Sequence, residues 1–294
     1  MEQTHPVRLF RGLEPATLAT RHPGWAEDVR AFGPWRGEQG GFLAAAGAAA
    51  PVWVLDECPS ALDVAWELCA DGALPEWGAV LAVSQASGRG QLRRHWVSAP
   101  GNLHVAVRFP VEPKGSGWTS LAPLLAGWLF CRALGGLGEP VRLKWPNDLL
   151  VDAGDGGWAK TGGMLLEERG GVAVVGAGLN LVHAPQAREM RGDAAHPAGI
   201  LPRRALPGGP LGLWRALVKV LKNGYKHVVL EGVPSAFVKS VETQLAHMGT
   251  DVLVSERQGE SYRARIVGLS PEGGLRLLED GAERILFSGS FKPL

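Results

Sequence analysis

Short apolar runs recur through the middle of the chain and limit what it can fold into. They have the length and composition of buried strands and lie at residues 52–55, 79–83, 103–109, 141–150, 160–168 and 172–181. Runs of four to ten such residues, bounded by glycine, proline or charged residues, are typical of β-strands. The sequence at 152–157 has the composition of a hairpin turn. The chain is therefore expected to build a β-sheet.

Longer segments have helical patterns. Residues 119–134 are apolar on every side, which predicts a buried helix, and two glycines follow as a stop signal. Residues 211–230 and 235–247 have amphipathic helical spacing. A shorter helix is expected after Ser60, because a serine can cap the amides of a first turn.

The two ends of the chain differ from the middle. Residues 1–50 contain scattered proline, glycine and arginine and no helix-turn-helix pattern, so we interpret them as an irregular extension without DNA-binding function. From residue 251, short alternating segments are separated by turn sequences at 258–259, 271–273 and 280–281. This pattern predicts a small all-β module, with a boundary near residues 248–249.

The composition limits which classes of function are possible. The 294 residues are 46% hydrophobic and 20% charged, as in a soluble globular protein, and the net charge is only +1. A basic binding site must therefore be local. Cys58, Cys69 and Cys131 lack CxxC spacing, which favours reduced thiols. No signal peptide or membrane-length apolar segment is evident, so a cytoplasmic protein without a membrane partner is expected.

The stretch 84–96 lies between two expected strands and is a candidate anion-binding loop. Gly88 and Gly90 flank Arg89, and two more arginines, a histidine and Trp96 follow. Glycine lets backbone amides approach a ligand closely, and a guanidinium suits phosphate or carboxylate. The structural alternative is a solvated basic hairpin.

Lys160 extends the candidate site from another strand. It opens a strand and is followed by Gly162 and Gly163, so it can reach a pocket floored by bare backbone. Together with Arg89 it would offer two cations to a carboxylate and an ATP α-phosphate, which otherwise repel each other. Lys160 alone is also compatible with a solvated strand end.

Other polar motifs stand where strands are expected to end. Asn147 and Asp148 could orient a nucleotide or a Mg²⁺–phosphate complex through their oxygens. Taken singly, these two residues also fit a turn, Asn180 fits a bond to its own backbone, and Trp96 and Trp145 fit core packing. The order and spacing of the motifs favour the functional interpretation.

Taken together, the motifs resemble those of the biotin protein ligases, a family related to lipoate ligases. The resemblance covers residue 52 to the end and rests on Gln85 to Trp96, Ser98-Ala99-Pro100-Gly101-Asn102-Leu103, Lys144-Trp145-Pro146-Asn147-Asp148, Lys160-Thr161-Gly162-Gly163-Met164-Leu165-Leu166-Glu167 and Gly176-Ala177-Gly178-Leu179-Asn180. It implies an α+β fold, in which a mixed β-sheet packed with helices forms a class II synthetase-like catalytic domain. A small SH3-like β-barrel would follow it. The expected domains are 1–50, 51–248 and 249–294.

The resemblance also implies a reaction. Biotin and ATP would form biotinyl-5′-AMP with Mg²⁺, and a lysine of a biotin carrier domain of a carboxylase would then accept biotin. It leaves the metal ligands unknown and allows a homodimer. Lys160 and Arg89 would be catalytic. Biotin and its adenylate would contact Gln85, Gly88, Arg89, Gly90, Gln91, Trp96, Lys160, Gly162 and Gly163. The nucleotide would contact Arg89, Lys144, Asn147, Asp148 and Asn180.

The sequence departs from the family pattern at several positions. The run 56–60, Asp-Glu-Cys-Pro-Ser, stands where the family has Ser-Thr-Asn. Gln91 replaces the loop's second arginine, Arg93 stands where glycine is common, and Ser290 stands where glutamate is common. If Gln91 loosens the loop, the adenylate should escape faster. Two alternatives stay open: a paralogue that adenylates another carboxylic acid, and a non-catalytic binding protein on the same scaffold.

Overall fold

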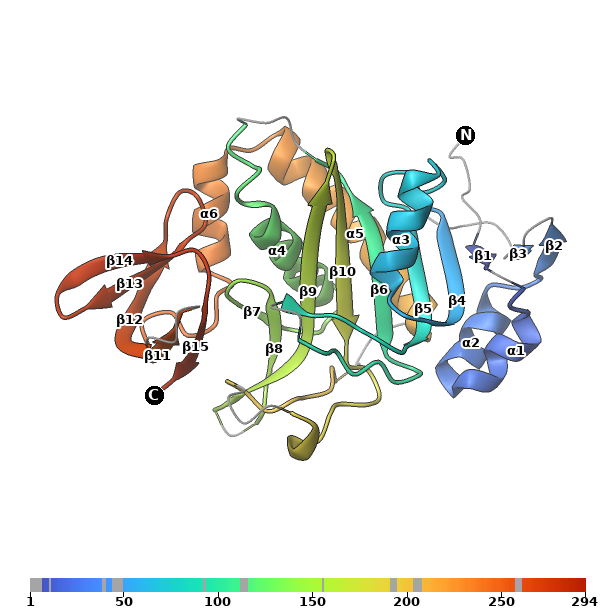
Figure 1. The fold of residues 1–294 in the computed structure, drawn as a ribbon, viewed down its shortest axis with the longest axis horizontal. Helices are drawn as coiled ribbons and strands as arrows, with labels where there is room; N and C mark the ends of the chain where they lie inside the picture. The colour runs from blue at the N-terminus through green and yellow to red at the C-terminus, as the bar shows by residue number, and fades with distance from the viewer. Residues whose placement is uncertain are drawn as a thin grey trace.

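The structure of the protein is a computed structural model, which describes residues 7–10, 12–38, 41–43, 50–91, 94–111, 116–154, 156–190, 195–202, 208–256 and 261–294. These ranges contain two sheets, one of ten strands and one of five. Figure 1 shows the large sheet at the centre of the molecule and the small sheet, with the C-terminus, to its left.

The large sheet is mixed, as predicted. Its strands, in spatial order, are β2 (Arg36–Glu38), β3 (Gly41–Leu43), β1 (Val7–Leu9), β4 (Val52–Cys58), β5 (Ala79–Gln85), β6 (Leu103–Phe109), β10 (Val172–Leu179), β9 (Trp158–Arg169), β8 (Asp148–Asp152) and β7 (Arg142–Lys144). The pairs β1–β4 and β4–β5 are parallel, and the other pairs are antiparallel. The expected α+β class, with a mixed sheet packed by helices, is confirmed.

Helices cover both faces of this sheet. Along β5, Val80 and Ala82 pack in the cluster that contains helix α3 (Ala61–Ala70), whereas Leu81 and Val83 pack in the cluster on the other face. This alternation follows from the two-residue period of a strand. Helices α4 (Ala122–Gly136) and α5 (Pro210–Tyr225) cover that second face, behind the sheet in Figure 1.

The predicted helices are present, with shifted ends. Helix α3 follows Ser60 as expected, but the serine side chain makes no capping hydrogen bond. Helix α4 begins at Ala122 and contains both glycines that were expected to stop it. Helix α5 continues into a π-helical turn, η3 (Lys226–Leu230), and α6 (Pro234–Glu242) ends earlier than predicted. Burial of α4 outweighs the weak helix propensity of its glycines.

The interpretation of residues 1–50 as irregular was wrong. Helices α1 (Pro15–Arg21) and α2 (Pro23–Ala31) form there, and β1 adds the segment to the large sheet beside β4. Residues 44–49, which are alanine except for Gly47, lie outside the described residues. Long-range strand pairing, which local sequence patterns do not report, organises this end of the chain.

Asp28 of α2 fastens this N-terminal region to α5. Its buried carboxylate accepts hydrogen bonds from the backbone amides of Gly209, Leu211 and Gly212 at 3.0, 2.9 and 2.9 Å. These amides lie at the start of α5, where backbone donors have no partner within the helix. One side chain therefore joins two regions separated by about 180 residues of sequence.

The small sheet is antiparallel throughout. Its order is β14 (Ala282–Leu286), β13 (Leu275–Glu279), β12 (Ser261–Leu269), β11 (Asp251–Ser255) and β15 (Ser290–Pro293). A small all-β segment after residue 250 is thus confirmed. The predicted turn at 258–259 lies outside the described residues. None of the helices within the described ranges combines the length and hydrophobicity needed to span a bilayer.

Candidate active site

One cavity of about 770 Å³ gathers most of the predicted site residues, although they come from distant parts of the chain. Its wall contains Gln85, Arg89, Gly90, Gln91, Trp96, Lys144, Asn147, Asp148, Lys160, Gly163 and Asn180. The two cations on which the sequence argument depended, Arg89 and Lys160, therefore lie in the wall of the same cavity. A cavity of this volume is in the range of small-molecule sites.

Of the two glycines expected at the floor of the cavity, only Gly163 lines it, and Gly178 of the neighbouring strand takes the second place. Gly163 of β9 pairs with Gly178 of β10, and the indole of Trp96 lies over both. A Cβ atom added to Gly178 would come within 2.5 Å of that indole. The Trp96 Nε1 atom is buried and has no hydrogen-bond partner among the described residues. The indole therefore fills the space that side chains at the two glycines would occupy.

A β-bulge helps to aim Lys160 into the cavity. Leu149 of β8 pairs with Gly162, whereas the next residue, Leu150, pairs with Lys160, so the register shifts by one residue on β9. Bulges re-aim side chains in this way and are common beside functional sites. The Lys160 Nζ atom lies 2.6 Å from Asp148 Oδ1 and 5.6 Å from the Trp96 ring.

Positive charge is concentrated around Asp148. Although burial opposes ionisation of this carboxyl, Lys160, Lys144 and Arg94 hold its pKa below the usual value. Lys144 is buried, and burial, with help from Lys160 and Arg94, lowers its pKa. The Lys144 ammonium lies 4.4 Å from the ring of Phe291. Three cations thus share one carboxylate, which leaves an excess of positive charge available to an anionic ligand.

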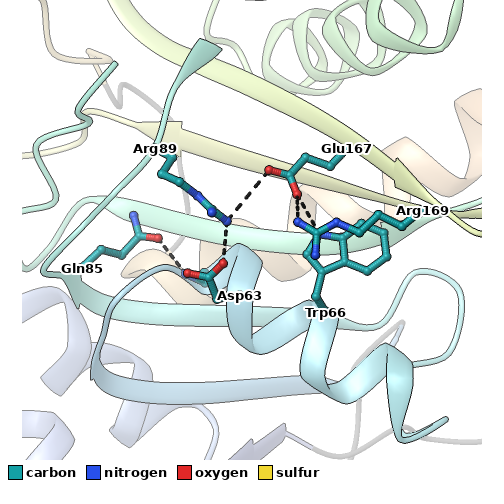
Figure 2. A network of polar contacts seen from close by, with 7 residues as sticks. Asp63, Trp66, Gln85, Arg89, Glu167 and Arg169 are labelled. Carbon is teal, nitrogen blue, oxygen red and sulfur yellow. Dashed lines mark hydrogen bonds and ion pairs between the residues drawn. The ribbon is translucent and has the colours of Figure 1, made fainter. Parts of the chain in front are cut away.

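Arg89 is already engaged by two carboxylates (Figure 2). Its Nη2 atom lies 2.6 Å from Asp63 Oδ1 on α3 and 3.9 Å from Glu167 Oε1 on β9. The backbone of the loop is also folded, since Gly90 N donates to Arg94 O and Trp96 N donates to Gly88 O, both at 2.8 Å. Arg93 lies outside the described residues.

Gln85 lies at the end of the cavity formed by α3. Its Oε1 accepts from the Ala61 amide at 2.8 Å, and its Nε2 donates to Ser98 Oγ at 2.8 Å. Ser60 and Leu62 also line this end, together with Val105 and Leu165. A mostly apolar surface with a few polar groups suits an organic acid with one polar end.

The run 56–60 contributes less to the cavity than its place in the sequence suggested. Ser60 lines the cavity, but Asp56 accepts a hydrogen bond from Arg21, and Glu57 Oε2 accepts one from Ser84 Oγ at 3.4 Å. The residues after the run, at the first turn of α3, take the wall positions instead.

Two predicted contact residues lie away from the cavity. A Cβ atom on Gly162 would meet the Leu179 side chain at 2.5 Å and Gly178 O at 2.8 Å, so this residue faces the packed core. Gly88 packs against the far end of its own loop, where an added Cβ atom would lie 2.5 Å from Trp96 O. The bulge explains the first result, because it places Lys160 and Gly163 toward one side and turns Gly162 away.

The two asparagines have structural bonds as well as wall positions. The Asn147 amide donates to Met164 O, which fastens the β7–β8 turn to β9. Asn180 Nδ2 donates to Gly199 O at 3.0 Å, but its buried Oδ1 has no partner among the described residues. Asn180 therefore retains an acceptor for a ligand donor group.

Sequence reasoning missed several contributors to the wall, among them Arg94, His196 and Lys292. Arg94 was read only as part of a basic loop, and His196 and Lys292 were not singled out. His196 stacks on His247 with Nε2 atoms 3.1 Å apart, so one imidazole donates to the other. Burial, then neighbouring positive charge, lowers the pKa of both imidazoles to about 4. Arg94, as the last arginine of the basic loop, was a usable signal, whereas no motif marked His196 or Lys292.

The described residues contain no group of three or more His, Cys, Asp or Glu side chains arranged to hold a metal ion. Mg²⁺ commonly takes most of its ligands from substrate phosphates and water, with one or two carboxylates from the protein. Asp148 is the carboxylate of the cation cluster that could serve in this way.

Comparison with known proteins supports the predicted resemblance. Residues 60–181 match the model of the biotin/lipoate A/B protein ligase family. A biotin–[acetyl-CoA-carboxylase] ligase of Paracoccus denitrificans is 35% identical over 41% of this chain and 51% of that protein. A ligase of the same description from Mycobacterium tuberculosis is 36% identical over 40% of this chain and 44% of that protein. The match thus spans about half the length of these relatives.

Solved structures share the fold over a longer part of the chain. The biotin protein ligase of Aquifex aeolicus in complex with biotin and ATP superimposes with a TM-score of 0.64 at 22% identity, covering 83% of this chain and 98% of that chain. The Leishmania major ligase in complex with biotinyl-5-AMP gives a TM-score of 0.56 at 22% identity, covering 83% and 98%. At this identity the superposition establishes a common fold, and the resemblance to biotin protein ligases is confirmed.

Proposed function

We propose that this chain, whose residues 60–181 match the biotin/lipoate A/B protein ligase family, activates biotin with ATP and transfers it to a lysine of a carboxylase biotin carrier domain. The observation that carries the proposal is the shared cavity. Its α3 end is apolar and suits the acid. At the other end Lys160 contacts Asp148, and Lys144 and Arg94 add positive charge that suits phosphates. The relatives that match are themselves ligases of this type.

In the first step, a biotin carboxylate oxygen attacks the α-phosphorus of ATP, and pyrophosphate leaves. Lys160 lies between the carboxylate and the phosphate and lowers their mutual repulsion as the new bond forms. Trp96 excludes water above the glycine floor and contacts the acid. Gln85 orients the polar end of biotin, and Gly90 and Gln91 line the path of the adenylate.

In the second step, the carrier lysine amine attacks the acyl carbon of the adenylate, loses a proton, and AMP leaves. Lys144 stabilises the phosphate charge of the leaving group, and Asn147 keeps the turn that presents Asp148 in place. Asn180 Oδ1 accepts from the nucleotide. Mg²⁺ would arrive with the ATP phosphates, and Asp148 would supply a protein oxygen.

The proposal also divides the chain into three segments. We assign 1–50 as an N-terminal extension, 51–248 as a class II synthetase-like catalytic domain and 249–294 as an SH3-like β-barrel, which the small antiparallel sheet supports. Trp145 Nε1 donates to Gly273 O at 3.0 Å, so the catalytic segment and the small sheet are directly joined. The proposed setting is the cytoplasm, and a homodimer is compatible with this assignment.

The test is biotin-dependent exchange of pyrophosphate into ATP, followed by transfer of labelled biotin to a purified carrier domain. The parent protein should support both, and Lys160→Ala should reduce the first step by about 100-fold, the typical loss when a transition-state charge contact is removed. Because Lys160→Ala also removes the ion-pair partner of Asp148, its stability should fall. A cooperative urea transition of the variant then separates loss of chemistry from loss of fold.

The outcome also decides between the alternatives. Exchange with lipoate or octanoate in place of biotin would identify a paralogue that adenylates another acid. Binding of biotin without pyrophosphate exchange would identify a non-catalytic binding protein. Either result would overturn the proposed activity.

A further inference from the structure

The loop that carries Arg89 is tied to two other elements by a network of charged groups (Figure 2). Asp63 on α3 contacts the Arg89 guanidinium at 2.6 Å, and Glu167 on β9 lies 3.9 Å from the same Nη2 atom. Asp63 is 26 residues and Glu167 78 residues away along the chain. A loop, a helix and a strand thus meet at one guanidinium.

The second carboxylate in the network is itself held in place. Glu167 Oε2 accepts hydrogen bonds from Trp66 Nε1 at 2.9 Å and from Arg169 Nη2 at 2.7 Å. The Arg169 guanidinium also lies 4.5 Å from the Trp66 ring. Because Trp66 lies on α3 three residues after Asp63, both contacts come from one face of the helix.

Charge balance distinguishes Arg89 from the other cations of the cavity. Asp63 and Glu167 carry two negative charges, which match the two positive charges of Arg89 and Arg169. Around Asp148, by contrast, three cations share one carboxylate. An incoming phosphate should therefore be attracted mainly by the Asp148 cluster, and the main task of Arg89 must be a different one.

We propose that Asp63 and Glu167 are positioning residues that hold Arg89, and with it the loop residues 85–91 and 94–96, over the cavity before a ligand arrives. The loop is thus organised in advance and does not depend on the adenylate to fold it. This inference rests on the proposed function only where it concerns the adenylate: a loop held over the cavity slows escape of that intermediate. Arg89 acts as a tether first and as an anion contact second.

Hydrogen exchange of the ligand-free protein tests the tether without reference to activity. Peptides covering 85–96 should exchange about two- to fivefold faster in Asp63→Asn and in Glu167→Gln than in the parent, a modest factor because Asp63 and Arg89 are 42% and 37% exposed. Asp71→Asn at the end of α3 and Glu168→Gln on the other face of β9 should leave the exchange unchanged. Unchanged exchange in Asp63→Asn would overturn the proposal.

A double-mutant cycle shows whether the carboxylate acts through the guanidinium. Arg89→Gln alone should loosen the loop, and adding Asp63→Asn to it should have no further effect. Asp63→Glu, which keeps the negative charge, should retain most of the protection from exchange seen in the parent. Additive effects of the two substitutions would refute a shared tether.

The rate at which the adenylate is released distinguishes a tether from a competing contact. Asp63→Asn should release biotinyl-AMP about two- to fivefold faster while the KM for ATP stays unchanged. Slower release would mean that Asp63 competes with the ligand for Arg89, which would overturn the proposal. If the parent forms no adenylate, the proposed function fails, but the exchange experiment still decides whether the tether exists.

Discussion

Replacing Asp28 by alanine is expected to destabilise the protein strongly. The carboxylate is fully buried and accepts three hydrogen bonds from the first amides of α5, at 2.9–3.0 Å. Alanine would leave three amide donors at Gly209, Leu211 and Gly212 without their acceptor. It would also remove a contact that joins the N-terminal region to a core helix.

The expected magnitude follows from these three donors. A helix-capping residue replaced by alanine costs about 0.5–2 kcal/mol, and each buried donor left unsatisfied costs about 1–3 kcal/mol. Because water can reach some of the freed donors, the sum is an upper limit. We expect Asp28→Ala to lower the free energy of unfolding by about 3 kcal/mol at pH 4.5. Asp28→Asn should cost less, because its amide oxygen still accepts.

The effect should also depend on pH. Burial, against the three amide hydrogen bonds, raises the pKa of Asp28 from 3.8 to about 6. The native state therefore holds this proton more tightly than the unfolded state. The stabilising contribution is complete below pH 4 and is lost as the pH rises through 6. About two pKa units correspond to about 3 kcal/mol, so the parent should exceed Asp28→Ala by more at pH 4.5 than at pH 7.5.

Urea unfolding at the two pH values measures both quantities. Asp71→Ala, an exposed substitution at the end of α3, is the control and should change stability by less than about 0.5 kcal/mol. A cost for Asp28→Ala below about 1 kcal/mol at pH 4.5 would show that the cap contributes little. A cost that grows between pH 4.5 and 7.5 would refute the assigned direction of the pKa shift.

Further predictions concern the cavity. Gly178→Ala should displace the indole above it and weaken biotin binding at least about tenfold by calorimetry, whereas Gly135→Ala, with nothing within 4 Å of the added Cβ, should bind as the parent does. Gln91→Arg should slow adenylate release in stopped-flow chase, and an unaltered rate would refute a role in loop closure. His247→Phe should reduce the loss of melting temperature between pH 6.5 and 4, because His247 and His196 have lowered pKa values in the folded state; an unchanged pH profile would contradict this.

Local sequence patterns predicted the strands from residue 52 onward, the main helices and the motifs at strand ends. Apolar runs such as 103–109 have a local period that requires a buried strand, and the Lys144–Asp148 segment forms a turn between β7 and β8. The placement of Arg89, Lys144 and Lys160 in one cavity also agrees with the sequence prediction. The strands and this turn follow from residues near one another in the chain, whereas the shared cavity brings together residues up to 71 positions apart and was expected from the order and spacing of the motifs.

The partners of those residues depend on how the whole chain packs. The bulge that turns Lys160 toward Asp148 and Gly162 away from the cavity depends on pairing between β8 and β9. The contacts of Arg89 with Asp63 and Glu167, and of Asp28 with α5, join residues 26 to 184 positions apart. Strand register and ion pairing over such separations are set by the packing of the whole chain, so no local pattern in the sequence records them.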